Sequence, residues 1–174
     1  MTLNLSQVDI RACMEAAAEG VLDRLVKTHL RLEIEAAPDI GSFSADERRL
    51  RQVLFNLLSN AVGFSPEGAA VTLSAERESD AVAFTVIDRG PGIPPEAKDK
   101  VFDWFETDSQ GSEHRGTGLG LSLVRSFVEL HGGSIAIDSI VGQGTKVTCV
   151  FPLAHAADPV TRADVKQISK QSAA

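Results

Sequence analysis

Long apolar runs are absent from the sequence, and no stretch approaches the roughly 20 residues that a membrane-spanning helix requires. The first residues also lack the basic region and the apolar core of a secretory signal peptide. We therefore expect a cytoplasmic domain that makes no direct contact with a membrane. This expectation leaves a longer protein that contains the domain free to carry a membrane anchor elsewhere.

Cysteine and positive charge are both scarce. The two cysteines, Cys13 and Cys149, are far apart and belong to no CxxC motif or Cys/His cluster, so we expect buried thiols in a reducing compartment rather than a metal site. The 17 basic residues are outnumbered by 24 acidic ones, which gives a net charge of −7. This balance argues against nucleic-acid binding, which needs a basic face, but it does not exclude one phosphate ligand held locally.

The chain is long enough for one domain with a proper core. We place this domain at residues 1–153. From 154 to 174 the residues are mostly small and polar, with few apolar side chains to bury, so we expect a loosely held tail or linker there.

Hydrophobic periodicity predicts helices and strands in a mixed order. Asp9 is expected to cap the first helix, and Ser44 or Asp46 the second. Strands that pair beside helices without regular βαβ alternation predict an α+β two-layer sandwich. A short helical turn is expected at 95–100, and Phe102 and Phe105 after it should be core residues. The predicted helices cover residues 8–28, 46–64 and 121–130, and the predicted strands cover 30–36, 71–75, 82–87, 134–139 and 145–151.

Three glycines, Gly116, Gly118 and Gly120, lie directly before an apolar helical pattern. Glycine lets the backbone approach a ligand closely, and the unpaired N–H groups in the first turn of a helix attract phosphate. We interpret the run as a phosphate-binding helix N-terminus, and the alternative is a tight turn with close helix packing. The polar segment before it, about residues 106–117, cannot bury enough surface to order itself and is expected to form a mobile lid.

Two asparagines, Asn56 and Asn60, are four residues apart in the second predicted helix and therefore lie on one face. Asparagine is a poor residue for a helix interior because its amide competes for backbone hydrogen bonds. A solvated polar face is the simpler explanation. The functional alternative is an oxygen ligand for a hard cation such as Mg²⁺.

Alternation along the strand at 82–87 extends to Asp88. If the apolar residues of this strand face the core, Asp88 faces inward too, where an unpaired carboxylate is costly. Thr145 has the same parity as the apolar residues of the last strand. The glycine turn that contains Gly90 and Gly92 follows Asp88 directly. We favour a ligand-facing carboxylate, and an Asx-turn is the alternative.

Together these motifs resemble the ATP-binding catalytic domain of bacterial sensor histidine kinases, which belongs to the GHKL ATPase superfamily shared with DNA gyrase and the mismatch-repair ATPases. The resemblance covers about residues 5–153. Five boxes carry it in the order that the family has: Asn56–Ala61, Asp88–Ile93, Val101–Phe105, Gly116–Leu121 and Gly142–Thr145.

The resemblance implies a Bergerat fold, in which a mixed, mostly antiparallel sheet is covered on one face by about three helices, and it implies ATP and Mg²⁺ as ligands. By position, Asn60 is the Mg²⁺ ligand, Asp88 accepts from the adenine amino group, and Thr145 assists through a water. Asn56 near the phosphates and Arg115 beside the glycines are the other implied catalytic residues. The remaining implied ATP-binding positions are Gly90, Gly92, Ile93, Phe102, Gly116, Thr117, Gly118, Leu119, Gly120 and Leu121.

The implied function is transfer of the γ-phosphoryl group of ATP to a histidine on a separate dimerisation and phosphoacceptor domain, in the same protein or in trans, which then serves a response regulator. Gly63 stands where the family commonly has a basic residue, and Arg115 is the residue expected to compensate. No histidine begins a His-Glu or His-Asp box ahead of the domain, so we expect an excised catalytic domain, with a free-standing ATP-binding protein as the alternative. The four histidines are His29, His114, His131 and His155.

Three other functions stay open. A gyrase-type ATPase needs a glutamate to activate water where this chain has Asn56, a neutral and poor base. A non-catalytic module that senses nucleotide or binds protein finds its support in Gly63. An anti-sigma-factor kinase is a further relative, and it would phosphorylate serine or threonine.

Overall fold

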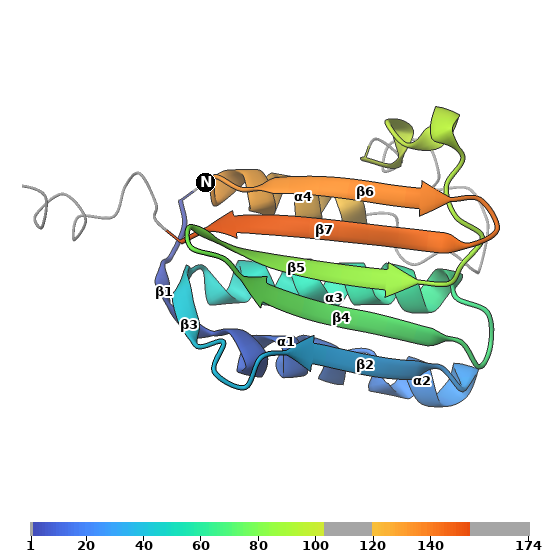
Figure 1. The fold of residues 1–174 in the computed structure, drawn as a ribbon, viewed down its shortest axis with the longest axis horizontal. Helices are drawn as coiled ribbons and strands as arrows, with labels where there is room; N and C mark the ends of the chain where they lie inside the picture. The colour runs from blue at the N-terminus through green and yellow to red at the C-terminus, as the bar shows by residue number, and fades with distance from the viewer. Residues whose placement is uncertain (1, 103–119, 154–174) are drawn as a thin grey trace, which may run out of the picture.

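The computed structural model describes residues 2–102 and 120–153, and it has a helical layer packed on a five-stranded sheet. Figure 1 shows the sheet in front and the helices behind it. The strand order is β2-β4-β5-β7-β6, in which β2 and β4 are parallel and the other neighbours are antiparallel. The predicted α+β sandwich with a mixed, mostly antiparallel sheet is confirmed. The strands are β2 (Arg31–Ala36), β4 (Ala70–Arg77), β5 (Ala81–Asp88), β6 (Ser134–Ile140) and β7 (Gly144–Pro152).

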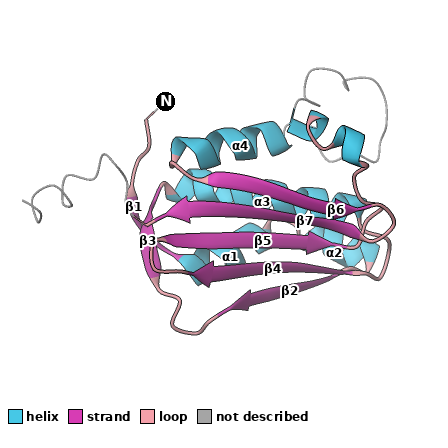
Figure 2. Ribbon diagram, turned by 45° about the horizontal axis from the view of Figure 1, so that its top comes forward, coloured by secondary structure: helices cyan, strands magenta, loops and turns pink. Residues whose placement is uncertain are grey.

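Four α-helices in the described residues, rather than about three, lie on one face of the sheet (Figure 2). The helix α3 is the longest of them, and its apolar stripe at helical spacing is buried against the sheet. Its buried residues include Leu50, Leu54, Leu57, Leu58 and Ala61. The helices are α1 (Ile10–Glu19), α2 (Leu22–Thr28), α3 (Glu47–Phe64) and α4 (Gly120–Leu130).

The single helix predicted over residues 8–28 is wrong. Val8 belongs to a short strand, β1 (Ser6–Asp9), which pairs antiparallel with β3 (Ser42–Ala45) in a separate two-stranded sheet that the sequence did not suggest. The helix also ends at Gly20, where a Cβ would lie 2.7 Å from Cδ2 of Phe55. A side chain at this position would therefore displace the ring of Phe55 in α3, and a second helix, α2, begins at Leu22.

Hydrogen bonds identify the residues that cap the first helix and α3. The carboxylate of Asp9 accepts from the N–H of Ala12 at 2.8 Å, which confirms it as the cap of α1. At α3 the cap is Asp46, whose carboxylate accepts from the N–H of Arg49 at 3.2 Å, whereas Ser44 lies within β3.

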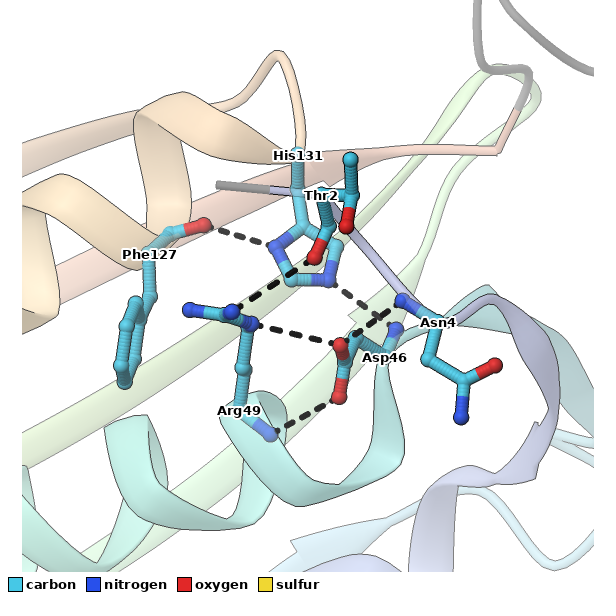
Figure 3. A network of polar contacts seen from close by, with 6 residues as sticks. All are labelled: Thr2, Asn4, Asp46, Arg49, Phe127 and His131. Carbon is cyan, nitrogen blue, oxygen red and sulfur yellow. Dashed lines mark hydrogen bonds and ion pairs between the residues drawn. The ribbon is translucent and has the colours of Figure 1, made fainter.

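A network of polar contacts joins the N-terminal segment to the start of α3 and the end of α4 (Figure 3). His131 is 1% exposed. Its Nδ1–H donates to the carbonyl of Phe127 at 2.7 Å, and its Nε2 accepts from the N–H of Asp46 at 3.1 Å. The carboxylate of Asp46 accepts from the N–H of Asn4 at 2.9 Å and pairs with Nε of Arg49 at 3.3 Å. We call these residues the N-terminal clasp.

Both cysteines are free and buried, as expected. Burial raises the pKa of each thiol, Cys13 and Cys149, to about 12, so neither is a reactive thiolate at neutral pH.

Candidate nucleotide site

The candidate site lies at the end of the sheet where β5 ends and β7 begins, on the right in Figure 1 and at the opposite end from the clasp. Asp88 is the last residue of β5 and pairs with Thr145 of β7. Val82, Phe84 and Val86 are buried in the core, and Asp88 continues their alternation. The structure therefore brings Asp88 and Thr145 together on the side of the sheet that the helices cover.

Asp88 is half-buried, and its environment disfavours ionisation. Loss of hydration raises its pKa above 3.8, although the N–H groups of Gly90 and Thr145 act in the opposite direction. Its Oδ1 accepts from the N–H of Gly90 at 2.8 Å. The Asx-turn and the inward carboxylate, considered above as alternatives, thus occur together.

The loop after β5 is fixed by close backbone contacts. Gly92 has a φ of +77°, and a Cβ there would collide with the carbonyl oxygen of Ile140. The carbonyl of Pro91 accepts from the N–H of Gly142 at 2.8 Å. On its other side, a Cβ at Gly90 would lie 2.8 Å from the carbonyl oxygen of Phe64 in α3. These glycines allow the loop to lie between the β6–β7 turn and the end of α3.

Ser139 of β6 is a site residue that sequence reasoning missed. Its Oγ accepts from the N–H of Ile93 at 2.7 Å and lies 2.9 Å from Oγ1 of Thr145 and 3.1 Å from the carbonyl oxygen of Gly144. Alternation along β6 places Ser139 on the same face as Ile135 and could have pointed to it.

The two asparagines of α3 have different surroundings. A Cβ at Gly120 would lie 2.9 Å from Nδ2 of Asn60, so the structure brings Asn60 against the first residue of α4. Asn56 is 9% exposed, and its Oδ1 accepts from Nε2 of Gln52 at 2.8 Å within the same helix. Between them, Arg24 donates from Nη1 to the hydroxyl of Ser59 at 2.6 Å, which ties this part of α3 to α2.

Of the remaining predicted positions, Phe102 and Leu121 lie within the described residues. Phe102 ends a short 3-10 helix, η2 (Lys100–Phe102), which follows η1 (Pro95–Ala97). It is half-buried with the guanidinium of Arg125 5.2 Å from its ring centre, so it is less buried than predicted. Leu121 of α4 packs against the core. Outside the described residues lie Phe105, the predicted lid at 106–117, the tail at 154–174, and Arg115, Gly116, Thr117, Gly118 and Leu119.

Within residues 2–102 and 120–153, no three His, Cys, Asp or Glu side chains gather as a metal site. Mg²⁺ commonly binds through few protein oxygens together with oxygens of its ligand. The amide of Asn60, beside the start of α4, fits that habit. In the same part of the chain, none of the helices is both long and apolar enough to span a bilayer.

Comparison with known proteins gives consistent matches. A family model described as histidine kinase-, DNA gyrase B-, and HSP90-like ATPase matches residues 45–155. Over 139 residues the chain is 42% identical to the circadian input-output histidine kinase CikA of Synechococcus elongatus, and the match covers 79% of this chain and 18% of CikA. This chain therefore spans only a small part of that relative.

Similar solved structures also include those of histidine kinases. The full-length structure of ShkA in complex with AMPPNP matches with a TM-score of 0.76 and 31% identity, covering 91% of this chain and 33% of ShkA. A nucleotide-free catalytic domain of the histidine kinase ThkA matches with a TM-score of 0.75 and 25% identity, covering 87% of this chain and 97% of that domain. The described fold thus corresponds to one nearly complete domain of ThkA.

Proposed function

The chain belongs to the histidine kinase-, DNA gyrase B-, and HSP90-like ATPase family, and we propose that it is the ATP-binding catalytic domain of a two-component sensor histidine kinase. It binds ATP with Mg²⁺ and donates the γ-phosphoryl group to a histidine on a separate dimerisation and phosphoacceptor domain. That domain in turn serves a response regulator. The similarity to CikA and to the AMPPNP complex of ShkA supports this proposal.

The half-buried carboxylate of Asp88 is the observation that carries the proposal. An ionised carboxylate only accepts hydrogen bonds, and the amino group of adenine offers N–H donors. Burial makes the charged form costly, which is characteristic of a group kept for a ligand rather than for stability. The backbone at Gly90 and the neighbouring strand at Thr145 hold the carboxylate in place.

The start of α4 and the side chain of Asn60 are proposed to receive the phosphates. The first turn of a helix offers N–H groups without partners in the helix, and Gly120 presents no Cβ between them and Asn60. Asn60 would hold Mg²⁺ through its amide oxygen, and the bound ion neutralises charge on the phosphate oxygens. Positioning of ATP is then the main contribution of the chain.

A hydrolase of the gyrase type is less well supported. Such an enzyme needs a base that activates water at the position of Asn56. Here the amide oxygen of Asn56 is occupied by Gln52, and an amide is in any case a poor base.

Titration calorimetry with ATP, in the presence and absence of Mg²⁺, tests the proposal. We expect the parent chain to bind ATP more tightly with Mg²⁺, and Asn60→Ala to lower the Mg²⁺-dependent affinity about tenfold or more. Asn4→Ala is the matched control, because its side chain is exposed at the clasp end and points away from the network in Figure 3. A parent chain that binds no ATP would refute the proposal, and an Asn60→Ala chain that responds to Mg²⁺ like the parent would remove Asn60 from the metal site.

A further inference from the structure

The hydroxyl of Ser139 contacts three polar groups of the candidate site, one in the loop after β5 and two at the start of β7. The N–H of Ile93 in the loop after β5 donates to it at 2.7 Å. The carbonyl oxygen of Gly144 lies at 3.1 Å, and the hydroxyl of Thr145 lies at 2.9 Å. The side chain is half-buried on the helix-covered side of the sheet, and Ser139 and Thr145 are directly opposed in the β6–β7 ladder.

Counting protons fixes the direction of these hydrogen bonds. A serine hydroxyl has one proton and two lone pairs. A carbonyl oxygen only accepts, so the proton of Ser139 goes to Gly144. The N–H of Ile93 occupies one lone pair of Ser139. For all three contacts to be hydrogen bonds, the hydroxyl of Thr145 must donate its proton to the remaining lone pair.

This arrangement determines what Thr145 presents to a ligand. With its proton directed at Ser139, its hydroxyl oxygen offers lone pairs to any further partner. Thr145 pairs with Asp88 across β5 and β7, so two hydrogen-bond acceptors stand side by side. The 6-amino group of adenine supplies N–H donors to such a pair, whereas the 6-oxo group of a 6-oxopurine is another acceptor and leaves a protein acceptor opposite it without a donor.

We propose that Ser139 is a positioning residue that makes the site selective for 6-aminopurine over 6-oxopurine nucleotides by holding the hydroxyl of Thr145 as an acceptor. The inference rests on the proposed ATP-binding function. Ser139 itself need not touch the nucleotide, because it acts through the proton of Thr145. Removing its hydroxyl frees Thr145 to rotate and to donate to a 6-oxo group.

Calorimetry of the full chain with Mg²⁺ and either ATP or GTP measures this selectivity. We expect Ser139→Ala to lower the ratio of ATP affinity to GTP affinity about tenfold, the worth of one hydrogen bond whose loss leaves a polar group unpaired. Ser139→Thr keeps the hydroxyl and should keep the ratio. Ser134→Ala makes the same change at an exposed position in the same strand and should match the parent.

A double-mutant cycle tests whether Ser139 acts through Thr145. Thr145→Val keeps the branched shape of the side chain but has no proton to orient, so Ser139→Ala should change the ratio no further in that background.

An unchanged ratio in Ser139→Ala, an equal loss of affinity for both nucleotides, or a full effect in the Thr145→Val background would each overturn the proposal while leaving ATP binding intact. A parent chain that binds neither nucleotide would refute the proposed function and this inference with it. If Ser139→Ala does not fold, Ser139→Thr and Thr145→Val decide, because selectivity lost in the former or kept in the latter contradicts the mechanism.

Discussion

Among single residues, Asp88 illustrates how a proposed ligand-binding group lowers the stability of the folded protein. Its pKa is raised in the folded protein, chiefly by burial, so the folded state binds the proton more tightly than the unfolded state does. The free energy of unfolding therefore falls as the pH rises from 3.8 through the folded-state pKa, and at pH 7 the charged carboxylate destabilises the folded protein. Asparagine removes the charge while keeping an oxygen that accepts from the N–H of Gly90.

We accordingly expect Asp88→Asn to raise the thermal midpoint at pH 7 and to weaken ATP binding roughly 10- to 100-fold, the worth of a charge-assisted hydrogen bond. The stability gap should close as the pH falls through the raised pKa, because the parent also becomes neutral. Thermal denaturation across this pH range and calorimetry with ATP check the two parts. Asp138→Asn, at an exposed position on β6, is the control. Equal midpoints at pH 7 would contradict the assigned cost of burial.

A substitution at Gly120 should likewise affect helix stability and ligand binding differently. Alanine favours a helix over glycine by roughly 0.5–1 kcal/mol, but the new Cβ would lie 2.9 Å from the amide of Asn60 and displace it. Gly120→Ala should leave the free energy of unfolding within about 1 kcal/mol of the parent and lower Mg²⁺-dependent ATP affinity about tenfold. Urea unfolding and calorimetry measure these. Ser126→Ala, on the exposed face of α4, should not alter affinity, and undiminished affinity in Gly120→Ala would count against contact between Asn60 and the ligand.

Among the elements, those with long periodic patterns could be predicted from the sequence. The stripe of α3 and the alternation of β5 each run over enough residues to fix both type and face, and this alternation led to Asp88. β3 has only four residues, and Val8 of β1 fits the helical spacing of α1, so periodicity could not separate them. Gly20 was the available signal for the helix break.

Some residues of the candidate site could likewise be predicted from the sequence, whereas others could not. Asp88 and Thr145 followed from strand parity, and their proximity needed only the pairing of two strands. Alternation along β6 also predicts the face on which Ser139 lies. Its hydrogen bond with Ile93, however, depends on a loop that folds back over the sheet, and no local sequence pattern predicts that placement. His131 is similar, because its partner Asp46 is 85 residues away in sequence.

At the clasp, Asp46 is the residue on which the ends of two helices and the N-terminal segment depend (Figure 3). Burial opposes its ionisation, but the N–H groups of Asn4 and Arg49 and the charge of Arg49 prevail and hold its pKa below 3.8. Its stabilising contribution is therefore fully present above pH 3.8 and is lost as the pH falls through the lowered folded-state value.

Asp46→Ala should lower the free energy of unfolding at pH 7 by about 1–2 kcal/mol, since it removes a helix cap and leaves the N–H of Asn4 without its acceptor. The difference from the parent should shrink below pH 3.8, where the parent loses the same contacts. Urea denaturation at the two pH values measures this. Asp39→Ala, an exposed turn residue, should be neutral, and a difference independent of pH would show that the charge of Asp46 contributes nothing.

In the whole molecule, α3 and α4 connect the clasp to the candidate site. α3 begins at the Asp46 cap and carries Asn60 near its other end, whereas α4 begins at Gly120 beside Asn60 and leads to His131 in the clasp. The N-terminal segment and the nucleotide end are therefore linked by two helices that pack against each other.

The whole molecule also limits where a phosphoryl group can go. His131 is buried with both ring nitrogens engaged, so it cannot receive the group while the fold is intact. His29 is exposed beside Glu67 in the turn after α2, not in a helical phosphoacceptor segment. We therefore expect transfer to a separate histidine-bearing domain rather than to the described part of this chain.

Incubation with ATP labelled at the γ-phosphate should give acid-labile label on an added histidine phosphoacceptor domain and none on this chain alone. Asn60→Ala should lower the labelling about 10- to 100-fold through loss of the proposed metal ligand, and Asn4→Ala should label like the parent. Because phosphohistidine is destroyed by acid whereas phosphoserine survives it, acid-stable label would favour a serine or threonine kinase. A chain that binds ATP but labels no added domain would instead favour a nucleotide-sensing module.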